Sequence, residues 1–261
     1  MSLRVQSLFY YPVKSLQSVS VNAIDLDEFG PRYDRRFMFV SEDGTFVTQR
    51  QEPALSQWSA SFDGDCLVLK HADQSWQFPL SSFSVSMPVK VWGDGVLGLK
   101  TDRDLREISE KLCRKVNLVY MPDSCFRQVD RAFFASDQRV SFADGFPILL
   151  TNTASLEDLN ERLKHPVEMW RFRPNLVVEG AEPYEEDGWS EIQIGEIHLR
   201  VVKPCSRCVM TTIDQHGQKG KEPLATLATY RKNDFGVCFG QNLVQLSQGN
   251  IRVGDEVKII A

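Results

Sequence analysis

Short strand patterns at regular spacing fill the first hundred residues and constrain the fold more than any other feature of the chain. The segments are mostly rich in β-branched, aromatic or other apolar residues, and glycine-containing turn signals separate several of them. Many short strands at this spacing predict a small barrel or sandwich. The predicted strands are residues 5–11, 19–26, 37–40, 58–62, 66–70, 75–78, 89–92 and 97–101.

The second half of the chain mixes helix and strand patterns. Thr101 or Asp102 is expected to cap the first helix, and Thr153 or Ser155 the second. Pro223 stands at the start of the third, where its missing N–H costs nothing. The predicted helices are residues 102–115, 153–163 and 223–230, and the predicted strands are residues 117–120, 176–178, 191–194 and 198–202, with a final hairpin at 250–260.

These patterns predict an α+β protein that is predominantly β, with a few short helices. The likeness to a barrel is confined to the first part of the chain, and the first convincing helix follows it. We therefore expect an N-terminal β-barrel-like domain at residues 1–105 and a second domain at residues 106–261. A chain of 261 residues is long enough for two ordinary domains with their own cores.

Composition excludes several classes of protein. The net charge of -5 gives no electrostatic basis for nonspecific nucleic-acid binding. No apolar run approaches the roughly 20 residues that a membrane span needs, and no signal-peptide pattern opens the sequence. The six cysteines are scattered, which does not suggest a disulfide framework at this length. We therefore expect a cytoplasmic protein with no membrane or nucleic-acid partner.

One polar run carries the strongest chemical signal, Cys205-Ser-Arg-Cys208-Val-Met-Thr-Thr-Ile-Asp214. Arg207 precedes Cys208, and a thiolate beside a fixed positive charge has a lowered pKa, so Cys208 is a candidate reactive thiol or metal ligand. The pair is ambiguous by spacing alone, because it also fits half a zinc site, a redox dithiol or two packed cysteines. Residues 209–213 are expected to form a strand, which disfavours the redox dithiol. Asp214 is a candidate acid or base.

Cationic residues recur where strand patterns end. Lys14, Arg35, Arg50, Arg171 and Arg173 all stand near such transitions, in a chain that is acidic as a whole. A single lysine or arginine is usually a solvated surface charge. Several at strand ends instead favour a pocket for a phosphate or a similar anion, since arginine offers a bidentate fork and lysine a point charge.

The run from Cys205 to Asp214 resembles the signature of the MOSC domain of molybdenum-cofactor sulfurases and amidoxime-reducing proteins. The likeness extends over nearly the whole chain and in the expected order, and it is greatest to bacterial YcbX-like proteins and the mitochondrial amidoxime-reducing component. It implies a MOSC β-barrel domain after an N-terminal MOSC-associated barrel. The further matching segments are Tyr11-Pro-Val-Lys-Ser15, Asp34-Arg-Arg-Phe37, Thr48-Gln-Arg-Gln51, Phe142-Ala-Asp-Gly-Phe-Pro147, Ala154-Ser-Leu-Glu-Asp-Leu-Asn160, Phe172-Arg-Pro-Asn175, Lys221-Glu-Pro-Leu224 and Phe239-Gly-Gln241.

The resemblance implies a molybdenum–molybdopterin cofactor between the two domains. Cys208 falls on the family's metal-binding cysteine, which agrees with the preference of a soft thiolate for such a metal. The remaining residues that fall on family positions for the cofactor's phosphate and pterin are Lys14, Ser15, Arg35, Arg173, Asn175, Ser206 and Arg207.

The implied activity is reduction of N-hydroxylated compounds, such as hydroxylamines, amidoximes and N-hydroxylated bases. Asp214 or a nearby acid is expected to shuttle protons. Some bacterial relatives carry a C-terminal ferredoxin domain, and no cluster of four cysteines follows here, so electrons are expected from a separate flavin or iron–sulfur protein. Two alternatives remain open: a sulfur carrier with a persulfide on Cys208, and a non-catalytic molybdenum-cofactor binding protein.

Overall fold

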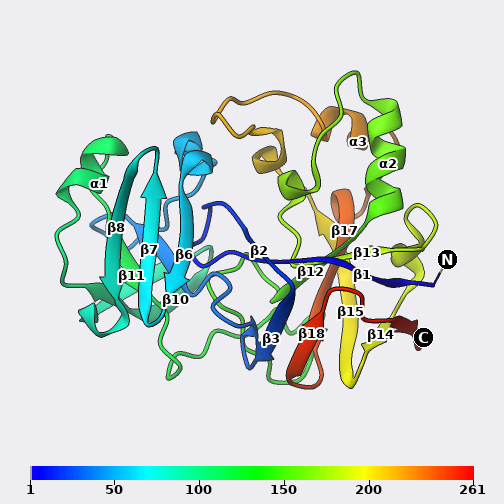
Figure 1. The fold of residues 1–261 in the computed structure, drawn as a ribbon, viewed down its shortest axis with the longest axis horizontal. Helices are drawn as coiled ribbons and strands as arrows, with labels where there is room; N and C mark the ends of the chain where they lie inside the picture. The colour runs from blue at the N-terminus through cyan, green and yellow to red at the C-terminus, as the bar shows by residue number, and fades with distance from the viewer. Residues whose placement is uncertain (1) are drawn as a thin grey trace.

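The computed structural model describes residues 2–261, in two strand-rich portions that lie side by side (Figure 1). Residues 37–120 form most of the first portion, and the second contains the largest sheet. The chain begins in the second portion, where Val5 N donates to Asp255 O at 2.9 Å, beside the C-terminal segment. Residues 11–36 then run between the two portions and lead to β5 (Phe37–Val40) in the first one.

The largest sheet has nine strands and forms the framework of the second portion. Its centre is β12, whose five residues are all buried and which pairs with one parallel and one antiparallel neighbour. The strands in spatial order are β19 (Val257–Ile259), β14 (Glu191–Ile194), β15 (Ile197–Ser206), β17 (Gly236–Gln245), β12 (Ile148–Asn152), β13 (Leu176–Glu179), β1 (Arg4–Tyr10) and β2 (Val19–Val21), with β16 (Lys232–Asn233) against β17.

Three smaller sheets complete the strand arrangement. In their pairing order none of the sheets that the structure describes within residues 2–261 closes into a barrel by itself. Their strands are β5 (Phe37–Val40), β11 (Asn117–Tyr120), β10 (Asp94–Thr101) and β9 (Phe83–Val91); β6 (Ser59–Asp63), β7 (Cys66–His71) and β8 (Gln74–Pro79); and β18 (Gly249–Arg252), β3 (Ala23–Asp27) and β4 (Gly30–Pro31).

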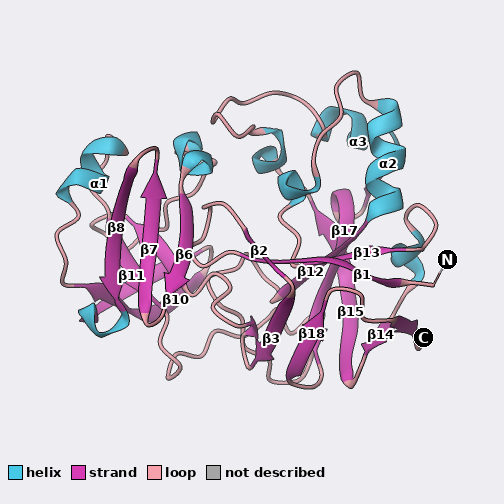
Figure 2. Ribbon diagram, in the orientation of Figure 1, coloured by secondary structure: helices cyan, strands magenta, loops and turns pink. Residues whose placement is uncertain are grey.

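Helices are few and lie outside the sheets (Figure 2). The longest, α2, supplies the crossover between the parallel strands β12 and β13, a connection that parallel pairing requires. The α-helices are α1 (Arg106–Lys111), α2 (Thr153–Arg162) and α3 (Leu224–Tyr230), and the 3₁₀ turns are η1 (Pro53–Gln57), η2 (Leu80–Ser82), η3 (Met169–Phe172), η4 (Glu185–Gly188) and η5 (Val209–Thr212). No helix in the described part of the chain combines the length and apolar character that crossing a membrane demands.

Each portion is stabilised by a large hydrophobic cluster of its own. One packs beneath the nine-stranded sheet and includes Leu8, Leu150 and Leu243. The other fills the first portion around Phe37 and Trp58, both nearly inaccessible to solvent. The many strands and the few short helices of the described chain confirm the prediction of a predominantly β, α+β protein. The boundary between residues 105 and 106 stays a prediction, and β1 and β2 pair within the sheet of the second half.

The helix predictions were right in position and wrong in detail. The first helix begins only at Arg106, because β10 continues to Thr101, whose hydroxyl bonds that of Ser82 at 2.9 Å. Neither Thr101 nor Asp102 caps it. The cap of α2 is Asn152, whose side-chain oxygen accepts from Ala154 N at 3.1 Å, so the prediction of Thr153 or Ser155 was one residue or more too late.

Two strand predictions were wrong. The end of the chain is no hairpin, because β18 pairs with β3 while β19 pairs with β14. Residues 209–212 form the 3₁₀ turn η5 instead of a strand. Their hydroxyls favour this turn: Thr211 Oγ1 donates to Cys208 O at 3.0 Å and Thr212 Oγ1 to Val209 O at 2.8 Å, the local back-bonding typical of threonine.

Candidate active site

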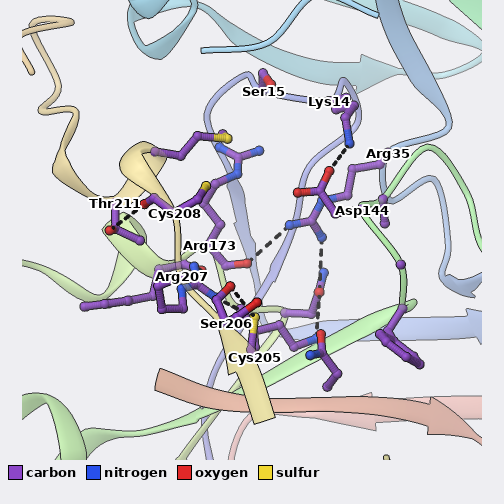
Figure 3. A pocket seen from close by; sticks show the side chains of 18 of the residues that line it. Lys14, Ser15, Arg35, Asp144, Arg173, Cys205, Ser206, Arg207, Cys208 and Thr211 are labelled. Atoms are coloured by element: carbon purple, nitrogen blue, oxygen red, sulfur yellow. Dashed lines mark hydrogen bonds and ion pairs between the residues drawn. The ribbon is translucent and has the colours of Figure 1, made fainter. Parts of the chain in front are cut away.

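A cavity of about 440 Å³, here called the central cavity, is lined by residues from both portions of the molecule (Figure 3). It brings together eight of the nine residues that the sequence predicts for the site. Asp214 is the exception. The eight are Lys14, Ser15, Arg35, Arg173, Asn175, Ser206, Arg207 and Cys208.

The crossing segments carry the first group of these residues. Lys14 and Ser15 follow β1, and Arg35 precedes β5. Backbone bonds fasten the two segments together: Arg35 N donates to Tyr11 O at 2.6 Å and Lys14 N to Phe37 O at 2.8 Å. Ser15 and Arg35, which are 20 positions apart in the sequence, are thereby held at one wall of the central cavity.

The central cavity is strongly electropositive. Seven cationic side chains line it and, within residues 2–261, Asp144 is its one acidic side chain. This excess stands in a chain whose net charge is -5, so the positive charge is concentrated at this place. A concave surface of one sign focuses the field and attracts an anionic ligand. The cations are Lys14, Arg35, Arg50, Arg171, Arg173, Lys203 and Arg207.

Asp144 lies between two of these cations. Its carboxylate accepts from Lys14 Nζ at 2.5 Å, from Arg50 Nη2 at 2.9 Å and from Trp92 Nε1 at 3.2 Å. Burial alone would raise the pKa of Asp144, but Lys14 and Arg50 hold it well below its ordinary value. The aspartate is therefore ionised and fixes the positions of both cations.

Lys14 is almost completely buried. Burial lowers the pKa of Lys14 to about 8, although Asp144 opposes the shift. Its ammonium group also donates to Phe142 O at 2.7 Å. A lysine in this state loses its proton within the range accessible to experiment.

A buried network around Asp34 orients three more residues of the wall. Asp34 accepts from Tyr11 N at 2.8 Å, from Asn175 Nδ2 at 3.0 Å and from Arg35 Nη1 at 2.6 Å. Arg35 also donates to Asn175 Oδ1 at 3.1 Å and to Arg173 O at 3.2 Å. The guanidinium of Arg35 thus has a defined direction.

Backbone strain is concentrated at the same wall. Ser15, Arg35 and Arg173 adopt left-handed conformations with φ of 72°, 48° and 57°. Such conformations cost non-glycine residues roughly 1–3 kcal/mol each and cluster at binding and catalytic sites. With Trp92 (φ 56°), four of the eight non-glycine residues that have a positive φ within residues 2–261 line this cavity, which makes it the candidate functional site.

The two cysteines of the run face different surroundings. Both are half-buried and line the central cavity. Arg207 Nη1 lies 2.8 Å from Cys205 Sγ, so the guanidinium predicted to act on Cys208 contacts Cys205 instead. The cation near Cys208 is Arg50: burial disfavours its charge, but Asp144 and then Cys208 outweigh burial and raise its pKa. Tertiary structure supplies the positive neighbour that Cys208 was expected to find next to it in sequence.

Cys208 would be a metal ligand without neighbouring protein ligands. Within the described residues no group of three or more His, Cys, Asp or Glu side chains is arranged to hold a metal ion. A metal at Cys208 therefore needs ligands from a cofactor. The zinc half-site that the spacing left open finds no completing residues there.

Asp214 serves the backbone of a turn outside the central cavity. Its Oδ1 accepts from His216 N and from Gln218 N, each at 2.8 Å. The predicted proton-shuttle role has no support from this position.

Family models and known proteins match almost the whole chain. Residues 2–113 match the MOSC N-terminal beta barrel domain and residues 137–258 the MOSC domain. The chain is 34% identical over 279 residues to mitochondrial amidoxime-reducing component 1 of Mus musculus, covering 98% of this chain and 82% of the relative. It is 34% identical over 282 residues to component 1 of Homo sapiens, with the same coverage, and 31% identical over 280 residues to component 2 of Bos taurus, covering 97% and 82%.

The chain belongs to the family of the amidoxime-reducing components. The MOSC resemblance inferred from the motifs is thereby confirmed. The relatives are named mitochondrial, so they lend no support to the cytoplasmic location expected from the sequence.

Some residues that line the central cavity were missed from the sequence. Asp144 was quoted within a matching motif but not selected, and Lys203 was not considered. Arg50 and Arg171 were predicted to contribute to an anion pocket but were not assigned to cofactor binding. Asp144 could have been selected from the sequence, because it is the acidic residue of the matching motif Phe142–Pro147 and the other charged residues chosen for the pocket are cations.

The low pKa of Lys14 predicts that anion binding weakens with rising pH. A phosphate monoester keeps its double charge above a pKa of about 6, whereas Lys14 loses its proton around pH 8. We expect cofactor-free protein to bind such a ligand about three- to tenfold more weakly at pH 9 than at pH 7, within the tenfold that one pKa unit allows. Titration calorimetry measures both constants. The Lys14→Met variant should show a smaller pH dependence, and an equal dependence would contradict the assignment.

Proposed function

We propose that this chain is a molybdenum-cofactor-dependent reductase of N-hydroxylated compounds, with Cys208 as the metal ligand. The observation that carries the proposal is a half-buried cysteine in a cavity with seven cations, in a member of the amidoxime-reducing component family. The relatives named for amidoxime reduction align with nearly the whole of this chain and over 82% of their own length, which supports a common activity.

The residues of the central cavity fit a molybdopterin. Three side-chain atoms of residues that line this cavity are buried without a hydrogen-bond partner in the described chain: Ser15 Oγ, Arg50 Nη1 and Arg207 Nε. Unsatisfied buried donors are costly, and a ligand with several oxygens can satisfy them. In this proposal Lys14, Ser15 and Arg35 hold the phosphate and pterin.

The rest of the wall completes the binding site in this proposal. Arg173, Asn175, Ser206 and Arg207 contact the pterin, and Cys208 supplies the protein's soft ligand to the metal.

The reaction consumes two electrons and two protons, breaks the N–O bond, and yields an amine or amidine and water. The cofactor, when bound, supplies the two-electron redox chemistry. The chain's own residues bind and orient it: the network of Asp34 and Arg35 fixes one wall, and Asp144 fixes Lys14 and Arg50. Electrons come from a separate flavin or iron–sulfur protein in this proposal.

Metal, pterin and activity measurements on one preparation test the proposal. We expect about one molybdenum and one pterin per chain, and reduction of benzamidoxime to benzamidine with a chemical electron donor. A persulfide on Cys208 without molybdenum would favour the sulfur carrier. Bound cofactor without turnover, under any electron donor, would favour a non-catalytic binding protein.

A further inference from the structure

A second cavity of about 430 Å³, here called the side cavity, adjoins the central one. Arg171, Arg173 and Met210 line both, so the two share a wall beside η5, the turn that Cys208 precedes. Its size lies within the range of small-molecule sites, about 300–1,000 Å³.

An unpartnered buried hydroxyl lines the side cavity. Ser56 is only 5% exposed, and its Oγ has no hydrogen-bond partner within residues 2–261. A buried polar group in that state costs free energy unless a ligand or water satisfies it. This group has no part in the central cavity.

Two glutamines add hydrogen-bond acceptors to the same surface. Gln49 Nε2 donates to Ser15 O at 2.6 Å, and Gln17 Nε2 donates to Ser56 O at 2.8 Å. Each of these bonds uses one of the two N–H groups of the amide, so each side chain keeps one N–H donor and its carbonyl oxygen, and the oxygen can accept from a ligand. Together with Ser56, these oxygens suit a ligand that carries N–H or O–H donors.

The other walls suit a flat apolar ring. Trp170 and Phe9 offer aromatic surfaces, and Met169 and Met210 offer flexible thioethers. Aromatic rings and thioether sulfur both make favourable contacts with a planar ring. The surface thus combines a stacking region with acceptors.

The charges that line the side cavity favour a neutral ligand over a cationic one. No acidic side chain of the described chain lines the side cavity, whereas two guanidinium groups do. Burial lowers the pKa of Arg171, although Asp214 opposes this, and lowers that of Arg173 to about 10. Two guanidinium groups in the wall repel a further cation placed beside them. An amidoxime is neutral near pH 7, and the amidine formed from it is a cation.

We propose that the side cavity binds the planar ring of an aromatic N-hydroxylated substrate and discriminates against the cationic product. The inference rests on the proposed function for the identity of the ligand. Ser56, Gln17 and Gln49 accept hydrogen bonds from the substrate, and Trp170 with the two methionines packs on its ring.

Filling the side cavity tests the proposal. Ser18 is half-buried and lines the cavity, so Ser18→Trp should occupy it. Ser20 is exposed on β2 and lines neither cavity, so Ser20→Trp is the matched control. Ser56→Ala removes the unpartnered hydroxyl with almost no change of shape. All three are compared with the unaltered protein as holoenzymes of equal molybdenum and pterin content.

Direct binding and substrate selectivity are the two readouts. Calorimetry should show benzamidoxime binding at least tenfold more tightly than benzamidine. Ser18→Trp should weaken benzamidoxime binding at least tenfold, Ser56→Ala about three- to tenfold, and Ser20→Trp less than twofold. The ratio of kcat/KM for benzamidoxime to that for the ringless acetamidoxime should fall at least tenfold in Ser18→Trp.

The outcomes separate this inference from the proposed function. If the unaltered protein reduces both substrates and Ser18→Trp and Ser56→Ala leave benzamidoxime binding and the ratio unaltered, the side cavity is not the ring site. If the unaltered protein reduces neither substrate but binds benzamidoxime in a Ser18-dependent way, the site stands and the reductase assignment fails. Binding of benzamidine as tight as benzamidoxime overturns the charge selection.

Discussion

Replacing Cys208 with alanine is expected to abolish metal retention and reductase activity, with each falling at least about 100-fold. Losing residues that merely support a metal ligand already costs about 10–100-fold in metal affinity or activity, and loss of a ligand should cost more. Cys208 would be the sole protein ligand, because no cluster of further metal-binding side chains surrounds it in the described chain. Elemental analysis and benzamidoxime turnover measure the two effects.

Cys205→Ala is the matched comparison for that experiment. Cys205 lies three residues earlier, lines the same cavity and has the same intermediate exposure. Its contact is with Arg207, so its loss should reduce metal content less than about threefold, as for a side chain outside the metal's ligands. Equal losses in the two variants would refute Cys208 as the specific ligand, as would full molybdenum content in Cys208→Ala.

Asp34→Ala is expected to lower the free energy of unfolding by about 3–5 kcal/mol. Removing one partner of a buried ion pair leaves the other charge uncompensated, which typically costs that much. Here the remaining charge is Arg35; Tyr11 N also loses its acceptor, and Asn175 Nδ2 loses one of its two acceptors. Burial raises the pKa of Asp34 despite the opposing effect of Arg35, so the pair is already costly to desolvate. Urea denaturation of cofactor-free protein measures the change.

An exposed aspartate, Asp73, provides the control for Asp34. Asp73 is exposed and makes no side-chain hydrogen bond or ion pair within the described chain, so Asp73→Ala should change stability by less than about 0.5 kcal/mol. A loss below about 1 kcal/mol in Asp34→Ala would contradict the role of this network as the organiser of the cavity wall.

Local patterns were a good guide to the strands and a poorer one to segment ends. Residues 37–40 were predicted with their observed bounds, because a buried apolar run between turns has few alternatives. The strand 89–92 was too short, since β9 starts at Phe83 and its exposed positions interrupt the apolar pattern. The C-terminal hairpin failed because its two strands find better partners far away in the sequence, which no local pattern encodes.

Motif chemistry identified the candidate site better than spacing did. Eight residues chosen from scattered motifs line one cavity, but their roles stay predictions until ligands are measured. Asp214 was chosen for its place beside the cysteines, yet its carboxylate points to the backbone of its own turn. Proximity in sequence is therefore weak support for a shared site.

The sequence by itself determined the family, the predominance of short strands and the identity of most residues around the central cavity, since these depend on residue type and order. Only the tertiary structure decided which charges meet. It gave Cys208 the neighbour Arg50 in place of Arg207 and set Asp144 between Lys14 and Arg50. It also formed a side cavity lined by Ser56, whose hydroxyl has no hydrogen-bond partner among residues 2–261. The reason is physical: Coulomb and hydrogen-bond energies depend on distances of a few ångströms, and chain crossings between the two portions set those distances.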